Sequence, residues 1–388
     1  MIPVTKPYLP ARSTLDKYID GIYERCWLTN NGPLVQELTR RLENYLGVEN
    51  LLLVGNGTLA LQMAFRTLGI NRPVGKGPAE AITTPFTYIA TASAIKWEGI
   101  EPIFADIDPH TWCIDTDNIK SLISKRTRAI VPVHVFGNSC DVDAINQIAK
   151  RNKLKVIYDA SHAFNVKLGE QSLLCQGDAS TLSFHATKLF HSVEGGAIIF
   201  KRKRDLKKAH KLINFGITGP EQIEALGVNA KMTEFQAAMG LSVLDEIEQN
   251  IAGKARVYKT YKQLLNSSSN AVTVTLQQQH ANITANYAYV PVLFENEDTC
   301  LKAKAKLHES DYQARRYFNP SLDTLRLLSK RKQKCPVSRD ISSRILCLPT
   351  YATLEDIHVA SIVRLLRDKS KEEAIFDKID TNSFIEIL

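Results

Sequence analysis

The chain has 388 residues, of which 44% are hydrophobic and 23% are charged, a composition typical of a soluble globular protein. The length suits two or three domains, or one large domain with a smaller one attached. No apolar run is long enough to span a bilayer and the first residues lack the apolar core of a signal peptide, so we expect a cytoplasmic protein without a membrane partner. The net charge of +8 allows an anionic partner, but the basic residues are dispersed or in short runs, which favours a solvated surface.

Short apolar segments alternate with amphipathic segments from about residue 34 to residue 160. The predicted helices are 34–47, 58–69, 88–99, 116–124 and 141–152. The predicted strands are 50–54, 80–84, 102–105, 129–136 and 155–159. Nearly continuous apolar strands between helices indicate a mainly parallel sheet covered on both faces. Ligands bind such sheets beyond the carboxyl ends of the strands, so the residues there are the candidates for a site.

Two further strands are predicted at 180–184 and 195–201, and the pattern changes after them. We then predict long helices at 232–250 and 254–265, and a polar linker to about residue 285. A second block has predicted strands at 286–294 and 345–349 and helices at 297–309 and 353–368, and the last fifteen residues give only a weak helical signal. We therefore expect an α/β fold with a large domain over residues 1–250, whose segment 1–33 packs near the site, and a smaller C-terminal α/β domain over residues 251–388.

Two strand ends carry groups suited to an anionic or cationic ligand. Gly57 and Thr58 follow a strand and open a helix, where free N–H groups and the helix dipole form a seat for phosphate. A Gly-Asn-Gly turn is more often only a tight connection. Asp159 ends the strand 155–159, where it either caps the next turn or holds a cationic ligand nitrogen.

Two further strand ends carry an amine and an aromatic ring. Ser183 lies at the end of the strand 180–184 and Lys188 just past it. A lone lysine is usually exposed, but a desolvated one becomes a nucleophile. Tyr88 lies at a strand-to-helix turn, where an aromatic residue alone is more often part of the core. Together the four features supply a phosphate seat, a carboxylate, an amine and a ring face, which are what pyridoxal 5′-phosphate requires.

Motifs through the first 265 residues carry a family resemblance. They include "NGTLAL", "TTPFTYIATASAI", "PIFADIDP", "VHVFGNSCDVDAI", "YDASHA", "SFHATK" with "EGG", and "GVNAKMTEFQAA". With these motifs the sequence resembles the DegT/StrS family of sugar aminotransferases, pyridoxal-phosphate enzymes of fold type I that act on nucleotide-linked keto sugars. The resemblance implies that Lys188 is the Schiff-base lysine and Asp159 the partner of the pyridine nitrogen. It also implies phosphate contacts from Gly57, Thr58 and Ser183.

The same resemblance implies further cofactor contacts. Tyr88 would stack on the ring, with Phe86 as the alternative because the spacing from the preceding proline differs from the family pattern by one residue. Ala160 would pack beneath the ring, and His162 would lie near the ring hydroxyl. Asn229 would reach the phosphate of the other subunit of a homodimer with shared active sites.

Substrate contacts follow from the resemblance as well: Asn30, His185, Arg315 and Tyr317. The expected partners are a nucleotide-linked keto sugar and the L-glutamate/2-oxoglutarate pair, without nucleic acid. The family's Pro-x-Leu-His motif reads "NPSLD" at 319–323, so its histidine has no counterpart. Seven cysteines without a Cys-x-x-Cys pair favour free thiols over a disulfide framework or a metal site.

His185 and the run Glu194-Gly195-Gly196 match the family members that act at carbon 4 of the sugar. The resemblance therefore implies conversion of dTDP-4-keto-6-deoxyglucose to dTDP-4-amino-4,6-dideoxyglucose, a step towards O-antigen, lipopolysaccharide or other surface glycans. An aminotransferase acting on a 3-keto sugar is the nearest alternative. A sugar dehydratase of this fold would have histidine in place of Lys188, so the lysine argues against that activity. A pyridoxal-phosphate-binding regulator that acts on nucleic acid would explain the basic charge, but the sequence contains no DNA-reading motif.

Overall fold

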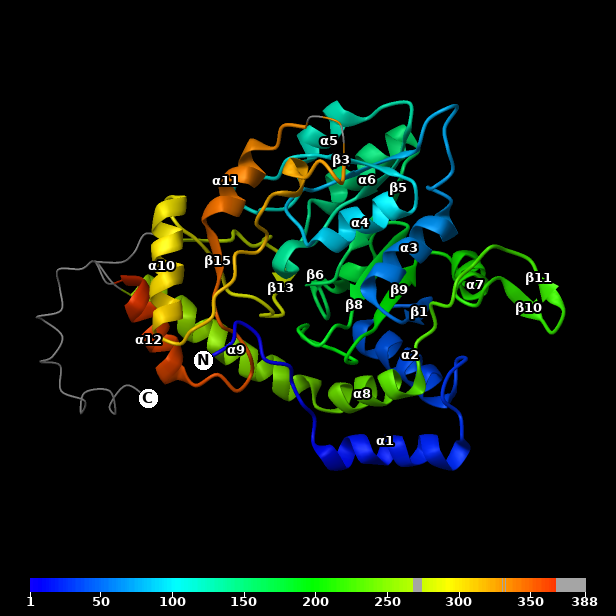
Figure 1. The fold of residues 1–388 in the computed structure, drawn as a ribbon, viewed down its shortest axis with the longest axis horizontal. Helices are drawn as coiled ribbons and strands as arrows, with labels where there is room; N and C mark the ends of the chain where they lie inside the picture. Colours follow the sequence, from blue (N-terminus) through cyan, green and yellow to red (C-terminus); the bar gives the residue numbers. More distant parts are fainter. Residues whose placement is uncertain (268–273, 330, 332, 368–388) are drawn as a thin grey trace, which may run out of the picture.

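A seven-stranded sheet forms the centre of the computed structural model, which describes residues 1–267, 274–329, 331 and 333–367 (Figure 1). The strand order is β1-β9-β8-β5-β4-β2-β3, and β9 alone runs against the other six. This arrangement confirms the predicted mainly parallel sheet. The strands are β1 (Leu51–Val54), β2 (Glu80–Thr83), β3 (Glu101–Phe104), β4 (Thr127–Val131), β5 (Lys155–Asp159), β8 (Ala179–Ser183) and β9 (Gly196–Phe200).

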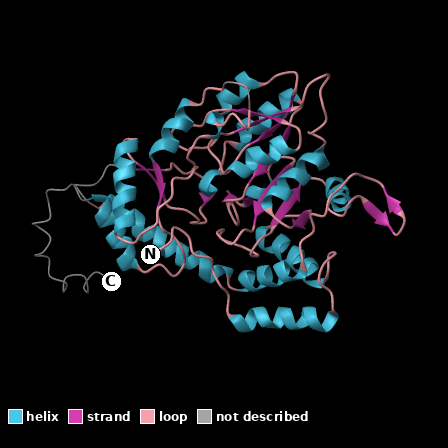
Figure 2. Ribbon diagram, viewed as in Figure 1, coloured by secondary structure: helices cyan, strands magenta, loops and turns pink. Residues whose placement is uncertain are grey.

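Helices cover both faces of this sheet (Figure 2). Successive strand residues pack into different cores: Leu51 and Leu53 face one, and Leu52 and Val54 face the other. This alternation explains why the strands read as continuous apolar runs. The first core is covered by α2 (Pro33–Leu46), α5 (Thr116–Leu122), α6 (Val142–Asn152) and α8 (Glu234–Asp245), and the second by α3 (Gly57–Leu68), α4 (Ile89–Trp97) and α7 (Lys203–Leu212).

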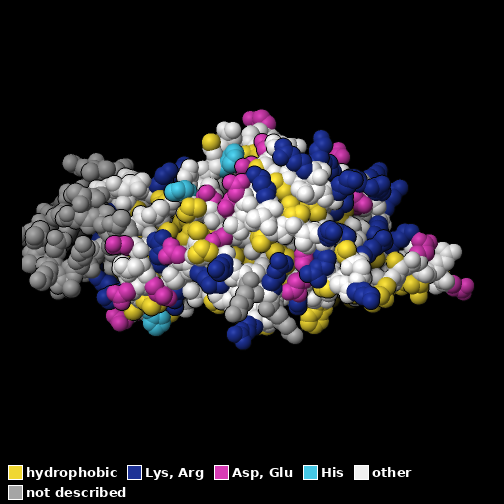
Figure 3. Space-filling model, turned by 90° about the horizontal axis from the view of Figure 1, so that it is seen from above, with side chains coloured by type: hydrophobic (Ala, Val, Ile, Leu, Met, Phe, Trp, Pro, Cys, Tyr) yellow, Lys and Arg dark blue, Asp and Glu magenta, His cyan; other side chains and the backbone are white. Residues whose placement is uncertain are grey.

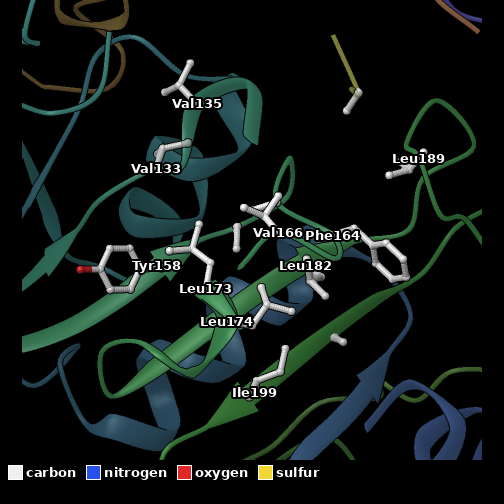
Figure 4. Close-up of a cluster of buried hydrophobic side chains, with 14 of the residues drawn as sticks. Val133, Val135, Tyr158, Phe164, Val166, Leu173, Leu174, Leu182, Leu189 and Ile199 are labelled. Atoms are coloured by element: carbon white, nitrogen blue, oxygen red, sulfur yellow. The ribbon is translucent and has the colours of Figure 1, made fainter. Parts of the chain in front are cut away.

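The first core holds the strand ends that precede the site (Figure 4). Tyr158 of β5 and Leu182 of β8 are fully buried there, each one residue before a polar side chain at its strand end. Val133 and Val135 pack beside them after β4. Leu168 of β6 (Lys167–Leu168) and Leu173 of η2 (Leu173–Cys175) also pack in this core, and β7 (Gln171–Ser172) pairs with β6. Close packing at this depth leaves the strand ends little freedom to move.

A smaller α/β unit follows the long helix α9 (Ile247–Asn266). Its antiparallel sheet has the order β12-β14-β15, and its core includes Val292, Leu307 and Leu346. The predicted domain boundary at 250/251 falls inside α9, and the division at that position stays a prediction. The elements are β12 (Thr275–Leu276), β13 (Ile283–Thr284), which pairs with β6, β14 (Pro291–Leu293), α10 (Glu297–Glu309), α11 (Pro336–Arg344), β15 (Ile345–Cys347) and α12 (Asp356–Arg367).

Several predicted bounds were wrong. The helices predicted at 232–250 and 254–265 divide instead at Glu246, whose carboxylate accepts hydrogen bonds from Tyr8 Oη at 2.7 Å and Ala11 N at 2.9 Å. The strand predicted at 286–294 is confined to β14, because the backbone of Ala288 is held by the side chains of Lys254 and Asn286 rather than by a neighbouring strand. The weak helical signal of the last fifteen residues lies outside the described residues.

Several elements had no predicted counterpart, among them α7, α11, a helix at the start of the chain and a projecting hairpin. Helix α1 (Arg12–Arg25) packs on α8 with Ile22 fully buried. The hairpin of β10 (Ile217–Gly219) and β11 (Gln222–Ile223) projects from the body beyond α7 (Figures 1 and 2). Both have few buried apolar residues, so neither has the period of an element packed on the core.

The N-terminal segment connects the small unit to the large one. Ile2 bridges Tyr312, and Val4 O accepts a hydrogen bond from Thr350 N at 3.0 Å. Tyr8 O is hydrogen-bonded to His191 Nε2 at 2.7 Å, three residues after Lys188 in the chain. The start of the chain therefore contacts the turn that carries the candidate lysine.

The surface is mixed in charge. Figure 3 shows Lys and Arg side chains over much of the visible face, gathered most densely towards the end that carries the hairpin and mixed with acidic and apolar side chains. Some basic residues are engaged within the chain: Lys208 Nζ donates to Thr67 O at 2.6 Å. None of the helices in the described part of the chain has the length and apolar character needed to cross a membrane.

A buried carboxylate ties α8 to the start of α2. Glu234 is 0% exposed, and its carboxylate accepts hydrogen bonds from Leu34 N at 2.9 Å and Val35 N at 3.0 Å, in the first turn of α2. These N–H groups have no acceptor within their own helix, and an anion is favourable at that end of the helix dipole.

Glu234→Ala should therefore destabilise the protein by about 2–4 kcal/mol, because two buried N–H groups lose their acceptor. Urea unfolding would measure the loss, with Glu221→Ala, at an exposed position of the hairpin turn, as control. A loss no larger than in the control would show that water replaces the carboxylate without cost.

Candidate active site

The predicted lysine lies in a small pocket between the large sheet and the segment before β14. The pocket is lined by Ser161, His162, Ser183, Thr187, Lys188 and Tyr289, among others. His162, Ser183 and Lys188 were predicted site residues, and the structure brings them together from the ends of β5 and β8. This is the carboxyl edge of the sheet, where a site was expected.

The Lys188 side chain is half-buried in this pocket, and its amine is largely desolvated. Burial lowers its pKa from 10.5 to about 8, while the nearby Asp159 carboxylate acts in the opposite direction. The amine donates a long hydrogen bond of 3.4 Å to Tyr289 Oη. With a pKa of about 8, roughly a tenth of this amine is uncharged at pH 7, and the uncharged amine is the nucleophilic and basic form.

Asp159 is a buried carboxylate, 5% exposed, that accepts two hydrogen bonds from neutral donors. Thr91 Oγ1 donates to Oδ2 at 2.7 Å, and Ser161 N donates to Oδ1 at 3.1 Å. Thr91 Oγ1 lies 3.0 Å from Thr87 Oγ1, so Thr87 supplies the hydrogen that Thr91 accepts. The described part of the chain places no Lys or Arg side chain within ion-pair distance of Asp159. A cationic nitrogen of a ligand would give this buried carboxylate the charged partner that it lacks.

His162 is neutral and fixed in one tautomer. Burial, and secondarily the Lys188 charge, lowers its pKa well below the ordinary value. Its Nδ1 accepts a hydrogen bond from Phe136 N at 3.1 Å, so the proton is on Nε2. The ring lies parallel to that of Phe136, with 6.0 Å between centroids, and is tilted against Tyr289 at 4.6 Å.

The start of α3 forms the candidate phosphate seat. Asn56 caps the helix by accepting a hydrogen bond from Leu59 N at 2.9 Å, and the N–H groups of Gly57 and Thr58 lie in the first turn, where the helix supplies no acceptor. A Cβ on residue 57 would lie 2.8 Å from Ser183 Cβ. Glycine therefore allows the helix start to lie against the Ser183 side chain.

Tyr88, rather than Phe86, has a ring face available to a ligand. Phe86 is 0% exposed and packs edge-on against Phe136 and Phe318. Tyr88 is 52% exposed at the start of α4, and its hydroxyl influences the pKa of Tyr317, which places the two side chains near each other.

Two predicted substrate residues extend the site on the small unit. Arg315 places its guanidinium 4.5 Å from the centroid of the Tyr317 ring, and Tyr317 lies edge-on to Tyr289 at 6.1 Å. Tyr289 in turn contacts Lys188. These contacts form a continuous path from an exposed cation to the buried amine.

The other predicted contacts lie outside the pocket lining. Asn30 is exposed, with left-handed backbone, in the turn before α2. His185 is exposed, with Nε2 3.7 Å from a Glu194 carboxylate oxygen. Asn229 is exposed at the base of the projecting hairpin, where its backbone bridges Asn214.

Sequence reasoning missed Tyr289 and Thr91. Tyr289 lies 101 residues after Lys188 in a segment interpreted only as a strand, so its period gave no sign of a contact with the lysine. Thr91 is one helical turn after Tyr88 in a predicted helix, so the two side chains are expected on the same side of that helix. This spacing was the one sequence feature that could have placed Thr91 near the site.

These groups fit pyridoxal 5′-phosphate in their chemistry. The helix start with its uncompensated N–H groups suits the phosphate, and the buried Asp159 carboxylate suits a protonated ring nitrogen. The Lys188 amine suits an aldehyde carbon, and the free Tyr88 ring suits the face of the pyridine.

Known proteins resemble this chain over nearly its whole length. The model of the DegT/DnrJ/EryC1/StrS aminotransferase family matches residues 11–367. A dTDP-4-amino-4,6-dideoxy-D-glucose transaminase from Shigella dysenteriae is 38% identical, over 94% of this chain and 98% of its own length. One of the same name from Escherichia coli is 35% identical, over 95% and 98%. The crystal structure of DesI with its TDP-sugar product is 30% identical, covers 94% of this chain and 92% of that one, and has a TM-score of 0.86. The predicted family and fold are confirmed.

The pKa of Lys188 predicts how stability depends on pH. Because the folded state lowers this pKa from 10.5 to about 8, folding is penalised below pH 8 and the penalty is relieved as the pH rises towards 10.5. In cofactor-free protein, Lys188→Met should therefore add about 1–3 kcal/mol at pH 7, and its advantage should shrink at pH 9.5.

Urea unfolding at both pH values would measure this difference, with Lys17→Met at an exposed position of α1 as the matched control. An advantage of Lys188→Met that does not change with pH would contradict a desolvated amine.

Proposed function

The chain belongs to the DegT/DnrJ/EryC1/StrS aminotransferase family, and we propose that it is a pyridoxal 5′-phosphate-dependent transaminase of nucleotide-linked 4-keto-6-deoxy sugars. Its substrate would be dTDP-4-keto-6-deoxyglucose and its product dTDP-4-amino-4,6-dideoxyglucose. The observation that carries the proposal is the desolvated Lys188 amine beside the Asp159 carboxylate. The names of the relatives at 38% and 35% identity support the sugar.

The chain's own groups have distinct roles in this reaction. Bound pyridoxal phosphate supplies a carbonyl carbon that bonds to amines and a ring that accepts an electron pair. Lys188 would bind that carbon and, as the released amine, would move a proton between the reacting carbon of the substrate and the carbon that the cofactor supplies. Asp159 would keep the ring nitrogen protonated, Gly57, Thr58 and Ser183 would hold the phosphate, and Tyr88 and His162 would fix the ring.

Tyr289 would orient the lysine. Its hydroxyl is 3.4 Å from Nζ, and burial raises its pKa well above the ordinary value, so it stays protonated while the amine titrates. A neutral hydroxyl can accept a hydrogen bond from the ammonium and donate one to the free amine. It therefore serves both protonation states of Lys188.

The donor, location and pathway are inferred from the family resemblance. We propose L-glutamate as amino donor with 2-oxoglutarate as its product, a cytoplasmic reaction, and a product used in O-antigen, lipopolysaccharide or other surface glycans. His185 and Glu194, which lie 3.7 Å apart beyond the pocket, carry the carbon 4 assignment from the sequence motif.

Incubation with ¹⁵N-labelled glutamate and dTDP-4-keto-6-deoxyglucose should give an aminated sugar that contains the label, with nitrogen on carbon 4 by NMR. Lys188→Ala should lower the rate by more than about 1,000-fold, because it removes both nucleophile and proton carrier. UDP and GDP analogues and a 3-keto sugar complete the panel. Turnover of the 3-keto sugar alone would overturn the carbon 4 assignment, and turnover by Lys188→Ala at the wild-type rate would overturn the site.

We also propose a homodimer with shared active sites, because the projecting hairpin exposes apolar side chains. Ile223 and Leu226 are 74% and 83% exposed, and Phe215, Ile217 and Val228 are also exposed. A two-stranded hairpin is marginally stable by itself, and exposed apolar side chains grouped together mark an interaction site. Asn229, at the hairpin base, would then reach the phosphate in the partner.

The geometry also allows Asn229 to act within its own subunit. Its neighbour Ala230 accepts a hydrogen bond from Gly55 N at 2.9 Å, in the turn that leads to the helix start at Gly57. Asn229 is therefore adjacent in the chain to Ala230, which contacts the turn before the candidate phosphate seat of the same subunit. A mixing experiment separates the two arrangements.

Lys188→Ala mixed with an impaired Asn229→Ala variant should recover activity if Asn229 acts across the interface. One of the two sites in each heterodimer would contain neither lesion, so random exchange should restore about one quarter of wild-type activity. Differential tags would verify that mixed dimers form. Mixed dimers without recovery would place Asn229 in its own subunit, and an unimpaired Asn229→Ala variant would remove it from the site.

A further inference from the structure

The buried face of α9 carries two polar side chains where apolar ones would be expected. Asn250 and Lys254 are 2% and 5% exposed and lie one helical turn apart, so they face the same way. The helix starts beside the large core, to which Ile247 belongs, and continues into the small core, to which Val257 and Tyr261 belong. These two polar residues therefore lie where the two units meet.

Asn250 holds the turn that carries the candidate lysine. Its Nδ2 donates a 2.8 Å hydrogen bond to Leu189 O, and Leu189 directly follows Lys188. Both partners of this hydrogen bond are buried, so water does not compete for it. The backbone on one side of the lysine is thus fixed to α9.

Lys254 holds the segment that carries Tyr289. Its Nζ lies 3.4 Å from Ala288 O and 3.3 Å from Thr350 O, and Ala288 directly precedes Tyr289. Residue 253 must be glycine for this contact, since a Cβ there would lie 2.7 Å from the Ala352 side chain and carbonyl. The bare backbone lets the loop that contains Thr350 approach the helix.

Stability alone does not account for an amine at position 254. Among the described residues no carboxylate pairs with it, and burial lowers its pKa to about 8. A methionine would occupy a similar volume without the cost of desolvating a charge. What methionine could not do is donate hydrogen bonds to two backbone carbonyls that belong to different segments.

We propose that Asn250 and Lys254 of α9 are positioning residues that set the Lys188 amine against the Tyr289 hydroxyl by holding the backbone at Leu189 and Ala288. The inference rests on the proposed function in one respect, that Lys188 is the reacting group. The two residues touch neither the amine nor the hydroxyl and act through the main chain. A single helix face thereby fixes a contact between residues from two units of the fold.

The test measures the Lys188 amine directly in full-length protein freed of cofactor. Competitive labelling with acetic anhydride over a range of pH, followed by mass spectrometry of the Lys188 peptide, gives its apparent pKa. The variants are Lys254→Met and Asn250→Leu, and the control is Lys259→Met, the same substitution at an exposed position of the same helix. The groups that face the amine, Asp159, His162 and Tyr289, stay unchanged.

In either variant the loosened backbone should admit water to the amine and raise its pKa by about one unit, so that labelling of Lys188 at pH 8 falls about fivefold. The control should label as wild type does. A lower melting temperature with an unchanged labelling profile would mean that the α9 contacts are structural only. If Lys254→Met does not fold, Lys254→Gln, which keeps a donor without the charge, and Asn250→Leu decide the outcome.

Labelling needs no turnover, so it is independent of the sugar assay. A transaminase that labels unchanged in both variants would refute the positioning role while the proposed function stands. A shifted labelling profile in a protein that aminates no sugar would leave the positioning role supported and remove the proposed function.

Discussion

The site depends on one constraint, that a primary amine is kept out of water at the edge of a parallel sheet. Burial brings the pKa of Lys188 to about 8, while Asp159 opposes that shift and keeps the charged form accessible. The strand ends at Asp159 and Ser183 are set by a packed core, in which Tyr158 and Leu182 are fully buried. A core that moved would hydrate the amine and return its pKa towards the ordinary value, so the packing beneath the site is part of its chemistry.

The amine is enclosed only because two distant stretches of chain meet over it. Tyr289 is contributed by the segment before β14, and Arg315 and Tyr317 extend from it towards solvent. The long helix α9 and the N-terminal segment both span this junction, the first through Asn250 and Lys254 and the second through Val4 and Tyr8. These are polar contacts to main-chain carbonyls, and they specify position more narrowly than apolar packing because each requires a donor at a defined place.

What could be predicted from the sequence follows from local patterns. The strands of the large sheet and the helix after Asn56 have clear periods, and Gly57, Asp159, Ser183 and Lys188 each lie at the end of a strand, which is where the topology collects them. Tyr289 could not be found in this way, because nothing local links it to a lysine 101 residues earlier. The division of the long helical region at Glu246 was equally hidden, since it depends on Tyr8 and Ala11 of the distant N-terminal segment. The hairpin of β10 and β11 was missed because its apolar residues face outward.

The outward face of this hairpin favours association. A hairpin with exposed Ile223 and Leu226 is unfavourable in an isolated chain, and covering it would release free energy. The base of the same hairpin contacts the turn before the candidate phosphate seat, because Asn214 bridges Asn229 and the adjacent Ala230 accepts the Gly55 hydrogen bond. If a second copy of the chain covers the hairpin and orders the hairpin base, the turn before Gly57 would become more ordered as well, because the base contacts that turn directly. Association and cofactor binding would then share one free energy of coupling, so that each strengthens the other by the same factor whether Asn229 serves its own subunit or the partner.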